Sequence, residues 1–158
     1  MAVKPGEPAE ASDVWMRVLT DKSSWKKSGS VHNKAFTGKA VAPPMEPREW
    51  TLEFSGRLLS LVADVEKESA AFCRAPMTFS GVIFQTVENL RSDGNSFHKS
   101  TGCRTDVIYT PKNDDKAHAD LVAFGPSIEH RYLMREWLQD FIQYAAPGNC
   151  AIIEAMRV

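Results

Sequence analysis

Cysteine is scarce in this chain. The 158 residues include three cysteines, Cys73, Cys103 and Cys150, which are widely spaced and form no CxxC pair. An odd number of isolated cysteines argues against a disulfide framework and does not match the paired ligands of a zinc knuckle. Cysteines that remain thiols are typical of a reducing compartment, so we expect a cytoplasmic protein.

Long apolar runs and an excess of one charge are also lacking. No stretch approaches the roughly 18 apolar residues of a membrane span, and the opening MAVKPGEPAEAS lacks the apolar core of a signal peptide. The chain has 19 Lys and Arg against 20 Asp and Glu. We therefore expect no membrane association, and nucleic-acid binding is disfavoured because it depends on a positive excess.

The motifs of several catalytic classes are absent. There is no Walker loop, GxGxxG, GxSxG, HExxH or EF-hand loop. The residues that could bind a metal, His98, Cys103, His118 and His130, are separated by longer intervals than the close ligand pairs of zinc sites. The sequence therefore predicts no metal site.

A β-hairpin is the clearest feature that is present. Thr105–Thr110 (TDVIYT) and Ala117–Phe124 (AHADLVAF) are rich in β-branched and aromatic residues. The intervening run Pro111–Lys116 consists of turn-forming and charged residues. These segments predict two antiparallel strands joined by a six-residue loop.

The register of this hairpin decides which side chains meet. If Thr110 faces Ala117, then His118 lies opposite Tyr109. Asp120 follows two residues later, on the same face as His118. This register predicts a polar group made of Tyr109, His118 and Asp120, in which the last two are too far apart for an ideal direct hydrogen bond.

Other periodic segments follow a flexible lead over residues 1–12. Further strands are predicted over Val14–Thr20, Glu49–Phe54 and Cys150–Met156. Helices are predicted over Arg57–Cys73, Gly81–Arg91 and Ser127–Ala146, although Gly81–Phe84 (GVIF) taken alone also fits a strand. The pattern predicts a single α+β domain over residues 13–158, with a mostly antiparallel sheet packed against about three helices.

Three further residues are candidates for ligand binding. Arg17 lies in the middle of a predicted strand, where it either extends to solvent at an edge or reaches into a pocket to hold an anion. Ser55 directly follows the strand Glu49–Phe54, and His32 follows the Ser28-Gly29 turn. A pocket formed by strand residues would collect these groups with the polar side chains of the hairpin.

The order of these features resembles that of small bacterial ADP-ribosyltransferase-like toxins. The shared features are an arginine in the first strand, a Gly-Ser turn leading to an Ala-Phe pair, a serine after an aromatic strand and a late histidine. The resemblance implies that Arg17 holds the nicotinamide end of NAD and that Ser55 supports it. The late acidic residue that orients the ribose would be Asp120 or Glu154. NAD is then the candidate cofactor, and the expected catalytic set is Arg17, Ser55, His118 and Asp120.

The same residues also fit a structural interpretation. His118 and Asp120 would flank a solvent-facing hairpin, and Arg17 would pair with a glutamate across the sheet. The chain would then be a non-enzymatic protein-interaction module, such as an immunity protein or an accessory subunit. Its contact with a protein partner would use the acidic loop Asn113–Asp115 or an exposed aromatic such as Trp25. The sequence leaves open both the choice between enzyme and module and the oligomeric state.

Overall fold

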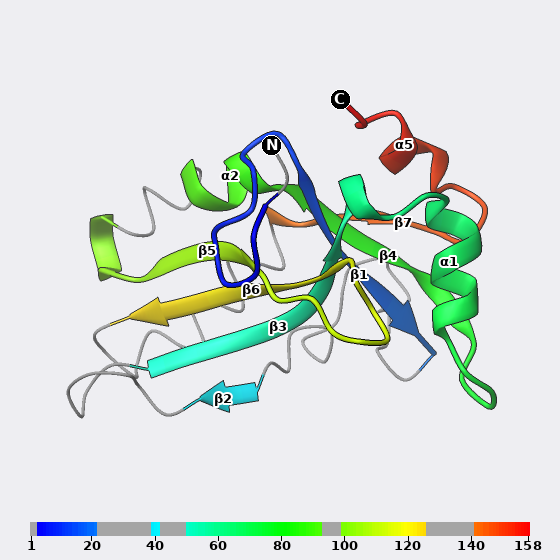
Figure 1. Ribbon diagram of the computed structural model, residues 1–158, viewed down its shortest axis with the longest axis horizontal. Helices are drawn as coiled ribbons and strands as arrows, with labels where there is room; N and C mark the ends of the chain where they lie inside the picture. The colour runs from blue at the N-terminus through cyan, green and yellow to red at the C-terminus, as the bar shows by residue number, and fades with distance from the viewer. Residues whose placement is uncertain (1–2, 22–38, 42–49, 93–98, 126–140) are drawn as a thin grey trace.

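The computed structural model describes residues 3–21, 39–41, 50–92, 99–125 and 141–158. Its strands are β1 (Val14–Thr20), β2 (Lys39–Val41), β3 (Trp50–Leu58), β4 (Phe79–Thr86), β5 (Arg104–Tyr109), β6 (His118–Gly125) and β7 (Gln143–Ala145). Its helical segments are η2 (Leu59–Leu61), α1 (Val65–Phe72), α2 (Val87–Ser92) and α5 (Ala151–Glu154). The strands form one antiparallel sheet in the order β5-β6-β3-β1-β4-β7, with β2 also paired to β3 (Figure 1). The predicted α+β class is confirmed.

Strand β1 lies near the middle of the sheet and has the predicted bounds. It pairs with β4 along its whole length, from Val14 opposite Thr86 to Thr20 opposite Phe79. Its pairing with β3 is much shorter and is limited to Trp15 and Met16. The sheet therefore opens between β1 and β3 just beyond Met16.

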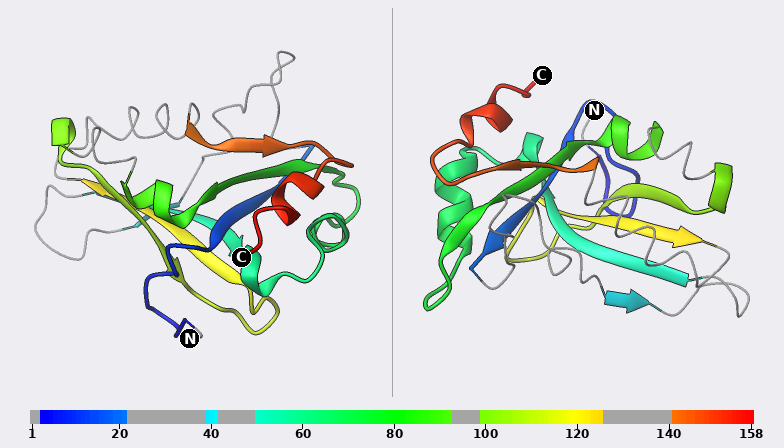
Figure 2. Two further views of the ribbon diagram at one scale, coloured as in Figure 1. Left: turned by 90° about the horizontal axis from the view of Figure 1, so that it is seen from above. Right: turned by 180° about the vertical axis from the view of Figure 1, so that it is seen from behind.

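Apolar residues pack on both faces of the sheet. Because side chains alternate along a strand, Trp15 and Leu19 enter one core while Val14 and Met16 enter the other. The first core also includes Phe54, Leu58, Ile83, Val107, Ala119 and Leu121. The second core also includes Val62, Val65, Val82, Phe84, Cys150 and Ile153. Helices α1 and α5 contribute to the second core and lie together at one end of the sheet (Figures 1 and 2).

The start of α1 is fixed by two carboxylates. The side chain of Asp64 accepts a hydrogen bond from the backbone N–H of Lys67 at 3.0 Å. Glu68 Oε2 accepts from the N–H groups of Ala63 and Asp64 at 2.7 and 2.9 Å. These bonds satisfy N–H groups that a helix start leaves without a partner, so the helix begins at Val65 and not at Arg57 as predicted.

Two glycines allow aromatic rings to lie directly against the backbone. A Cβ atom at Gly56 would come within 2.3 Å of Trp15 Nε1, and one at Gly81 would come within 2.3 Å of the Tyr144 ring. The Trp15 indole N–H donates to the Ala119 carbonyl at 3.2 Å. Gly56 therefore lies inside β3 beneath this indole, and the strand continues to Leu58, beyond the predicted end at Phe54.

The predicted N-terminal lead is bound along β5 where the structure describes it. The N–H groups of Gly6 and Ala9 donate to the carbonyls of Tyr109 and Val107 at 2.7 and 2.8 Å. The Tyr109 N–H in turn donates to the Glu7 carbonyl at 3.0 Å. Ala9 is buried in the first core, so this segment covers the outer edge of β5.

Three predicted elements differ from the structure. Residues Phe79–Thr86 are strand β4 and not the start of a helix, because β4 is buried between β1 and β7 and its apolar residues do not alternate. Of the helix predicted over Ser127–Ala146, residues 127–140 lie outside the described ranges, and Gln143–Ala145 is strand β7, which pairs with β4. The predicted final strand is helix α5, which follows the turn at Gly148.

Within the described residues, no helix is long and apolar enough to cross a membrane.

Candidate functional site

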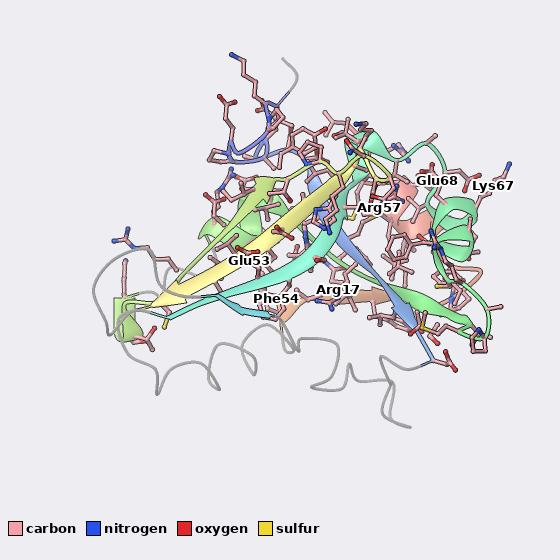
Figure 3. All side chains as sticks on the ribbon, turned by 60° about the horizontal axis from the view of Figure 1, so that its bottom comes forward. Arg17, Glu53, Phe54, Arg57, Lys67 and Glu68 are labelled. Carbon is pink, nitrogen blue, oxygen red and sulfur yellow. The ribbon has the colours of Figure 1, made fainter. Side chains whose placement is uncertain are left out.

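The predicted catalytic residues do not converge on one site. Arg17 alternates with Val14 and Met16 and shares a face with Trp15 and Leu19, which belong to the first core. His118 and Asp120 alternate with Ala119 and Leu121 of that same core, so they lie on the opposite face. Figure 3 shows the two sides, with Arg17 and Phe54 on one and Glu53 and Arg57 on the other. The expected convergence of Arg17 and His118 is therefore not found.

The charged side chain of Arg17 lies among apolar residues. Its neighbours include Trp15 and Leu19 along β1 and Ile83 across from it on β4, all of them fully buried. The Nη1 atom is buried and has no hydrogen-bond partner, and the glutamate expected across the sheet is not found among the described residues. Burial lowers the pKa of the guanidinium from its ordinary value.

The hairpin has the predicted strands but a different register. Tyr109 lies opposite Ala119, one residue away from the predicted pairing, and His118 lies beside Thr110. Because a shift of one residue moves a side chain to the other face, Tyr109 packs against the first core while His118 faces away from it. Tyr109 therefore does not belong to the polar group that was predicted to join it with His118 and Asp120.

His118, Thr110 and Asp120 form a small network on the polar side of the hairpin. The His118 Nδ1 atom lies 2.9 Å from the Thr110 carbonyl and 2.9 Å from the Thr110 hydroxyl. A carbonyl can only accept, so Nδ1 carries the hydrogen, and the Thr110 hydroxyl donates to Asp120 Oδ2 at 3.2 Å. His118 Nε2 lies 3.7 Å from Asp120 Oδ1, which is consistent with the expected lack of a direct hydrogen bond.

This network is closed to a substrate. The His118 side chain is only 9% exposed, and its Nε2 atom is buried without a hydrogen-bond partner among the described residues. Ser55 lies on β3 opposite Asp120. Its side chain is exposed and is on the same face of the sheet as His118 and Asp120. The arrangement joins the two ends of the β5–β6 loop and leaves His118 Nε2 inaccessible for proton transfer. The remaining ligand-binding candidate, His32, lies outside the described residues, as does Trp25.

An ion network next to this group holds the β5–β6 loop against the base of α1. Arg57 Nε lies 3.1 and 3.2 Å from the two carboxylate oxygens of Asp115, and its Nη2 lies 3.0 Å from Oδ1. Arg57 Nη2 also lies 3.6 Å from Glu68 Oε1 of α1 (Figure 3). These side chains are 33% exposed or less, so the pairing fixes the position of the loop.

The network forms one wall of a surface hollow of about 500 Å³, which we call the Phe72 hollow. Its lining residues are Arg57, Glu68, Ala71, Phe72, Arg74, Asp114 and Asp115. Phe72 itself is 55% exposed at the end of α1. The acidic loop Asn113–Asp115 was a candidate contact, whereas Phe72 was not among the predicted contact residues.

A second hollow of similar size has polar groups that already bond internally. It lies between residues 3–14, η2 and the last residues of the chain. Asp13 accepts hydrogen bonds from the N–H of Val14 at 2.8 Å and from the N–H of Ser60 at 3.1 Å. Arg157 donates to the carbonyls of Leu59 and Val62 at 3.0 and 2.6 Å. These groups hold chain segments together, so the Phe72 hollow is the better candidate for binding.

In the described part of the chain, no group of three His, Cys, Asp or Glu side chains is placed so that it could hold a metal ion. The fold and the hollow define an α+β protein with an open, charged surface depression. Comparisons with known proteins find no matching family model, no matching curated protein and no matching solved structure.

Proposed function

We propose that this chain is a non-enzymatic protein-interaction module that binds its partner through the Phe72 hollow. The observation that carries the proposal is an aromatic side chain, Phe72, held 55% exposed inside a depression rimmed by charged residues. Aromatic anchors surrounded by polar rims are typical of the residues that dominate binding energy at protein interfaces.

The ion network supports this function because it fixes the shape of the surface before binding. Arg57 reaches both Asp115 on the β5–β6 loop and Glu68 on α1. A loop that is already ordered loses less conformational entropy when a partner binds. The loop residue Asp114 remains exposed on the rim of the hollow, where it is available for contact.

The alternative is a toxin-like transferase that acts on NAD or on a nucleotide-bearing target. That reaction needs Arg17 and His118 to reach one ligand, and the described residues hold them on opposite faces of the sheet. An accessible base would also be needed, whereas His118 Nε2 is buried. The interaction module requires neither condition, so the geometry favours it.

The proposal is tested by isolating a partner with the tagged full-length chain and measuring its affinity by titration calorimetry. Phe72→Ala should weaken binding by about tenfold or more, as expected for an aromatic anchor. Ile152→Ala is the matched control, because Ile152 is 50% exposed on α5 and does not line the hollow. Equal affinities of the two variants would contradict the assignment of the surface.

A second measurement separates the module from the transferase. Arg17→Ala and His118→Ala should leave partner affinity unchanged once folding is verified by circular dichroism. Expression of the chain alone in bacteria should be harmless, and NAD should not shift its thermal midpoint. Growth arrest that Arg17→Ala relieves, together with a thermal shift by NAD, would favour the transferase.

A further inference from the structure

The outer edge of β5 holds an extended segment of the chain, residues 6–9, through main-chain bonds (Figure 1). Pro8 lies opposite Ile108 as an antiparallel pair. The Ala9 N–H donates to β5 at 2.8 Å, and the Tyr109 N–H of β5 donates back to the segment at 3.0 Å. Bonds between backbones are open to almost any extended peptide, so the edge does not depend on this particular sequence.

The side chains of this segment add little to the contact. Lys4–Pro8 are exposed, and Ala9 is the residue of this stretch that is buried in the first core, at 2% exposure. An alanine buries little apolar surface, so it stabilises the contact only weakly. The one requirement that the edge places on a side chain is therefore a small apolar residue at the position of Ala9.

The receiving surface stays in place without the segment. Arg91 Nη2 of α2 donates to the Ala9 carbonyl at 2.7 Å, and the Nε atom of the same guanidinium pairs with Asp106 of β5. The pair with Asp106 involves no atom of residues 6–9. Arg91 therefore remains oriented toward the carbonyl of whichever peptide lies on the edge.

The segment also closes the sheet on its outer side. Pro5 and Pro8 have no N–H group, and in the pair with Ile108 an N–H at position 8 would point away from β5. A further strand would find no donor there, and proline at an edge is one of the ways in which proteins prevent edge-to-edge pairing. Another chain can pair with β5 only after residues 6–9 have left it.

We infer that the β5 edge is a second docking site, which takes an extended segment of a protein partner in exchange for residues 6–9. The site shares no residue with the lining of the Phe72 hollow, so the inference goes beyond the function proposed above and does not rest on it. A second copy of the chain is not the expected occupant. Its segment offers the same contacts as the chain's own, which is present at an effective concentration on the order of millimolar.

Release of the segment in the full-length chain tests whether the edge accepts a peptide. Ala9→Glu places a carboxylate in the first core and should detach residues 6–9, whereas Lys4→Glu adds the same group at an exposed position. Fluorescence anisotropy measures binding of a labelled peptide of residues 3–12. The Ala9→Glu chain should bind it about tenfold or more tightly than wild type and Lys4→Glu, whose own segment competes.

Variant peptides show whether the binding uses the proposed contacts. The peptide with Ala9→Glu should not bind the released chain, and the peptide with Lys4→Glu should bind it like the parent peptide. Circular dichroism verifies that the chains fold. A folded Ala9→Glu chain that binds no peptide, or that binds both variant peptides equally, would overturn the inference.

Hydrogen exchange of the wild-type chain gives a test that needs no variant to fold. The amides of Gly6, Ala9 and Tyr109 donate between the segment and β5. The Leu58 N–H donates to the Ala117 carbonyl at 2.9 Å, between β3 and the start of β6. If the segment opens by itself, the first three amides should exchange together and about tenfold or more faster than the Leu58 amide. Equal protection of all four would overturn the exchange of segments.

Sedimentation velocity decides between the two sources of the incoming segment. The wild-type chain should remain a monomer, because its own segment closes the edge. A wild-type dimer that Ala9→Glu abolishes and Lys4→Glu preserves would show that a second copy supplies the segment, and would overturn a separate protein as the partner.

Discussion

Arg17 brings an electrostatic cost to the middle of β1. Its neighbours Trp15, Leu19 and Ile83 are fully buried, and its Nη1 atom has no hydrogen-bond partner among the described residues. Removing a charge from water without compensation is unfavourable, which is why burial lowers the pKa of this guanidinium. The side chain is therefore expected to limit stability.

Replacing Arg17 with an apolar residue of similar length tests this cost. Arg17→Met should leave the free energy of unfolding unchanged or raise it by about 1 kcal/mol, because apolar replacements of buried charges are often neutral or stabilising. Urea unfolding followed by Trp fluorescence measures the change, with Arg17→Lys as the control that keeps a charge. A loss of about 2 kcal/mol or more in Arg17→Met would contradict an uncompensated cation.

The buried thiol of Cys150 should make the free energy of unfolding depend on pH in the alkaline range. Burial, together with the hydrogen bond and negative charge of Glu66, raises its pKa to about 12 from 9.0. The unfolded chain loses this proton near pH 9 while the folded chain still keeps it. The stabilisation is therefore complete below pH 9 and is lost as the pH rises toward about 12.

Urea unfolding at a series of pH values measures this effect. The free energy of unfolding should fall above pH 9 with a slope of up to about 1.4 kcal/mol per pH unit from this one thiol. Cys150→Ala should show a shallower decline than wild type, while groups such as Cys103, whose pKa burial also raises, contribute equally to both. Identical slopes in the two proteins would refute the assignment.

The candidate residues show how much of a site one sequence can predict. Ser55, His118 and Asp120 do share a face, because the alternation of side chains along β3 and β6 follows from strand geometry. Tyr109 was placed on the wrong face because the predicted register was off by one residue. The loop sets that register through bonds such as the one from the Lys112 N–H to the Asp115 carbonyl. The local pattern of β1 does not specify whether Arg17 lies on the same face of the sheet as His118.

An ion pair with Arg57 holds Asp115 of the β5–β6 loop against β3. Asp115 accepts from Arg57 at 3.0 to 3.2 Å and also from the Ala117 N–H at 3.2 Å. Asp115→Asn removes the charge but keeps the shape, so it should lower the free energy of unfolding by about 1 to 2 kcal/mol. It should also accelerate hydrogen exchange of the Lys112 and Asp115 amides, which bond across the loop.

The neighbouring carboxylate supplies the control for this prediction. Asp114 is exposed and makes no side-chain bond within the described residues, so Asp114→Asn should change stability by less than about 0.5 kcal/mol. Hydrogen exchange measured by NMR should leave the Lys112 amide unaffected in this variant. Equal effects of the two substitutions would mean that the Arg57 pair does not order the loop.

The elements that were predicted correctly are rich in β-branched and aromatic residues and lie next to polar segments. Strand β1 lies between polar segments and the hairpin contains a polar loop, so both were found from the sequence. Strand β4 has a continuous apolar run because both of its faces are buried, and such a run does not distinguish a strand from a helix. Strand β7 forms through pairing with β4, a long-range contact that no local pattern specifies.

At the scale of the whole molecule, segments distant in sequence close both cores. Residues 3–12 lie along β5 and add Ala9 to the first core. On the other face, α5 adds Ile153 to the second core and packs against α1. Glu66 of α1 accepts hydrogen bonds from the N–H groups of Gly148 and Cys150 at 2.9 and 3.4 Å, which attaches the turn before α5 to that helix.

Arg157 completes this closure, because its guanidinium binds the chain just before α1. It donates to the carbonyls of Leu59, Val62 and Ala63 at 3.0, 2.6 and 3.3 Å, and it pairs with Glu154 at 2.6 Å. The side chain is 33% exposed, so solvent reduces the value of each bond. The Leu59 carbonyl also accepts from the Val62 N–H at 3.1 Å, so it keeps a partner without Arg157.

Arg157→Ala should therefore loosen the second core from one end. The expected loss is about 1 to 2 kcal/mol in the free energy of unfolding, measured in urea, with Arg104→Ala as a control. Arg104 is exposed on β5, and its side chain makes no bond with the rest of the described chain. Because Ile153 and Cys150 share the second core with Val65, Arg157→Ala should also speed alkylation of the buried Cys150 thiol in the native protein. An unchanged alkylation rate, alongside normal stability, would show that α5 stays packed without this side chain.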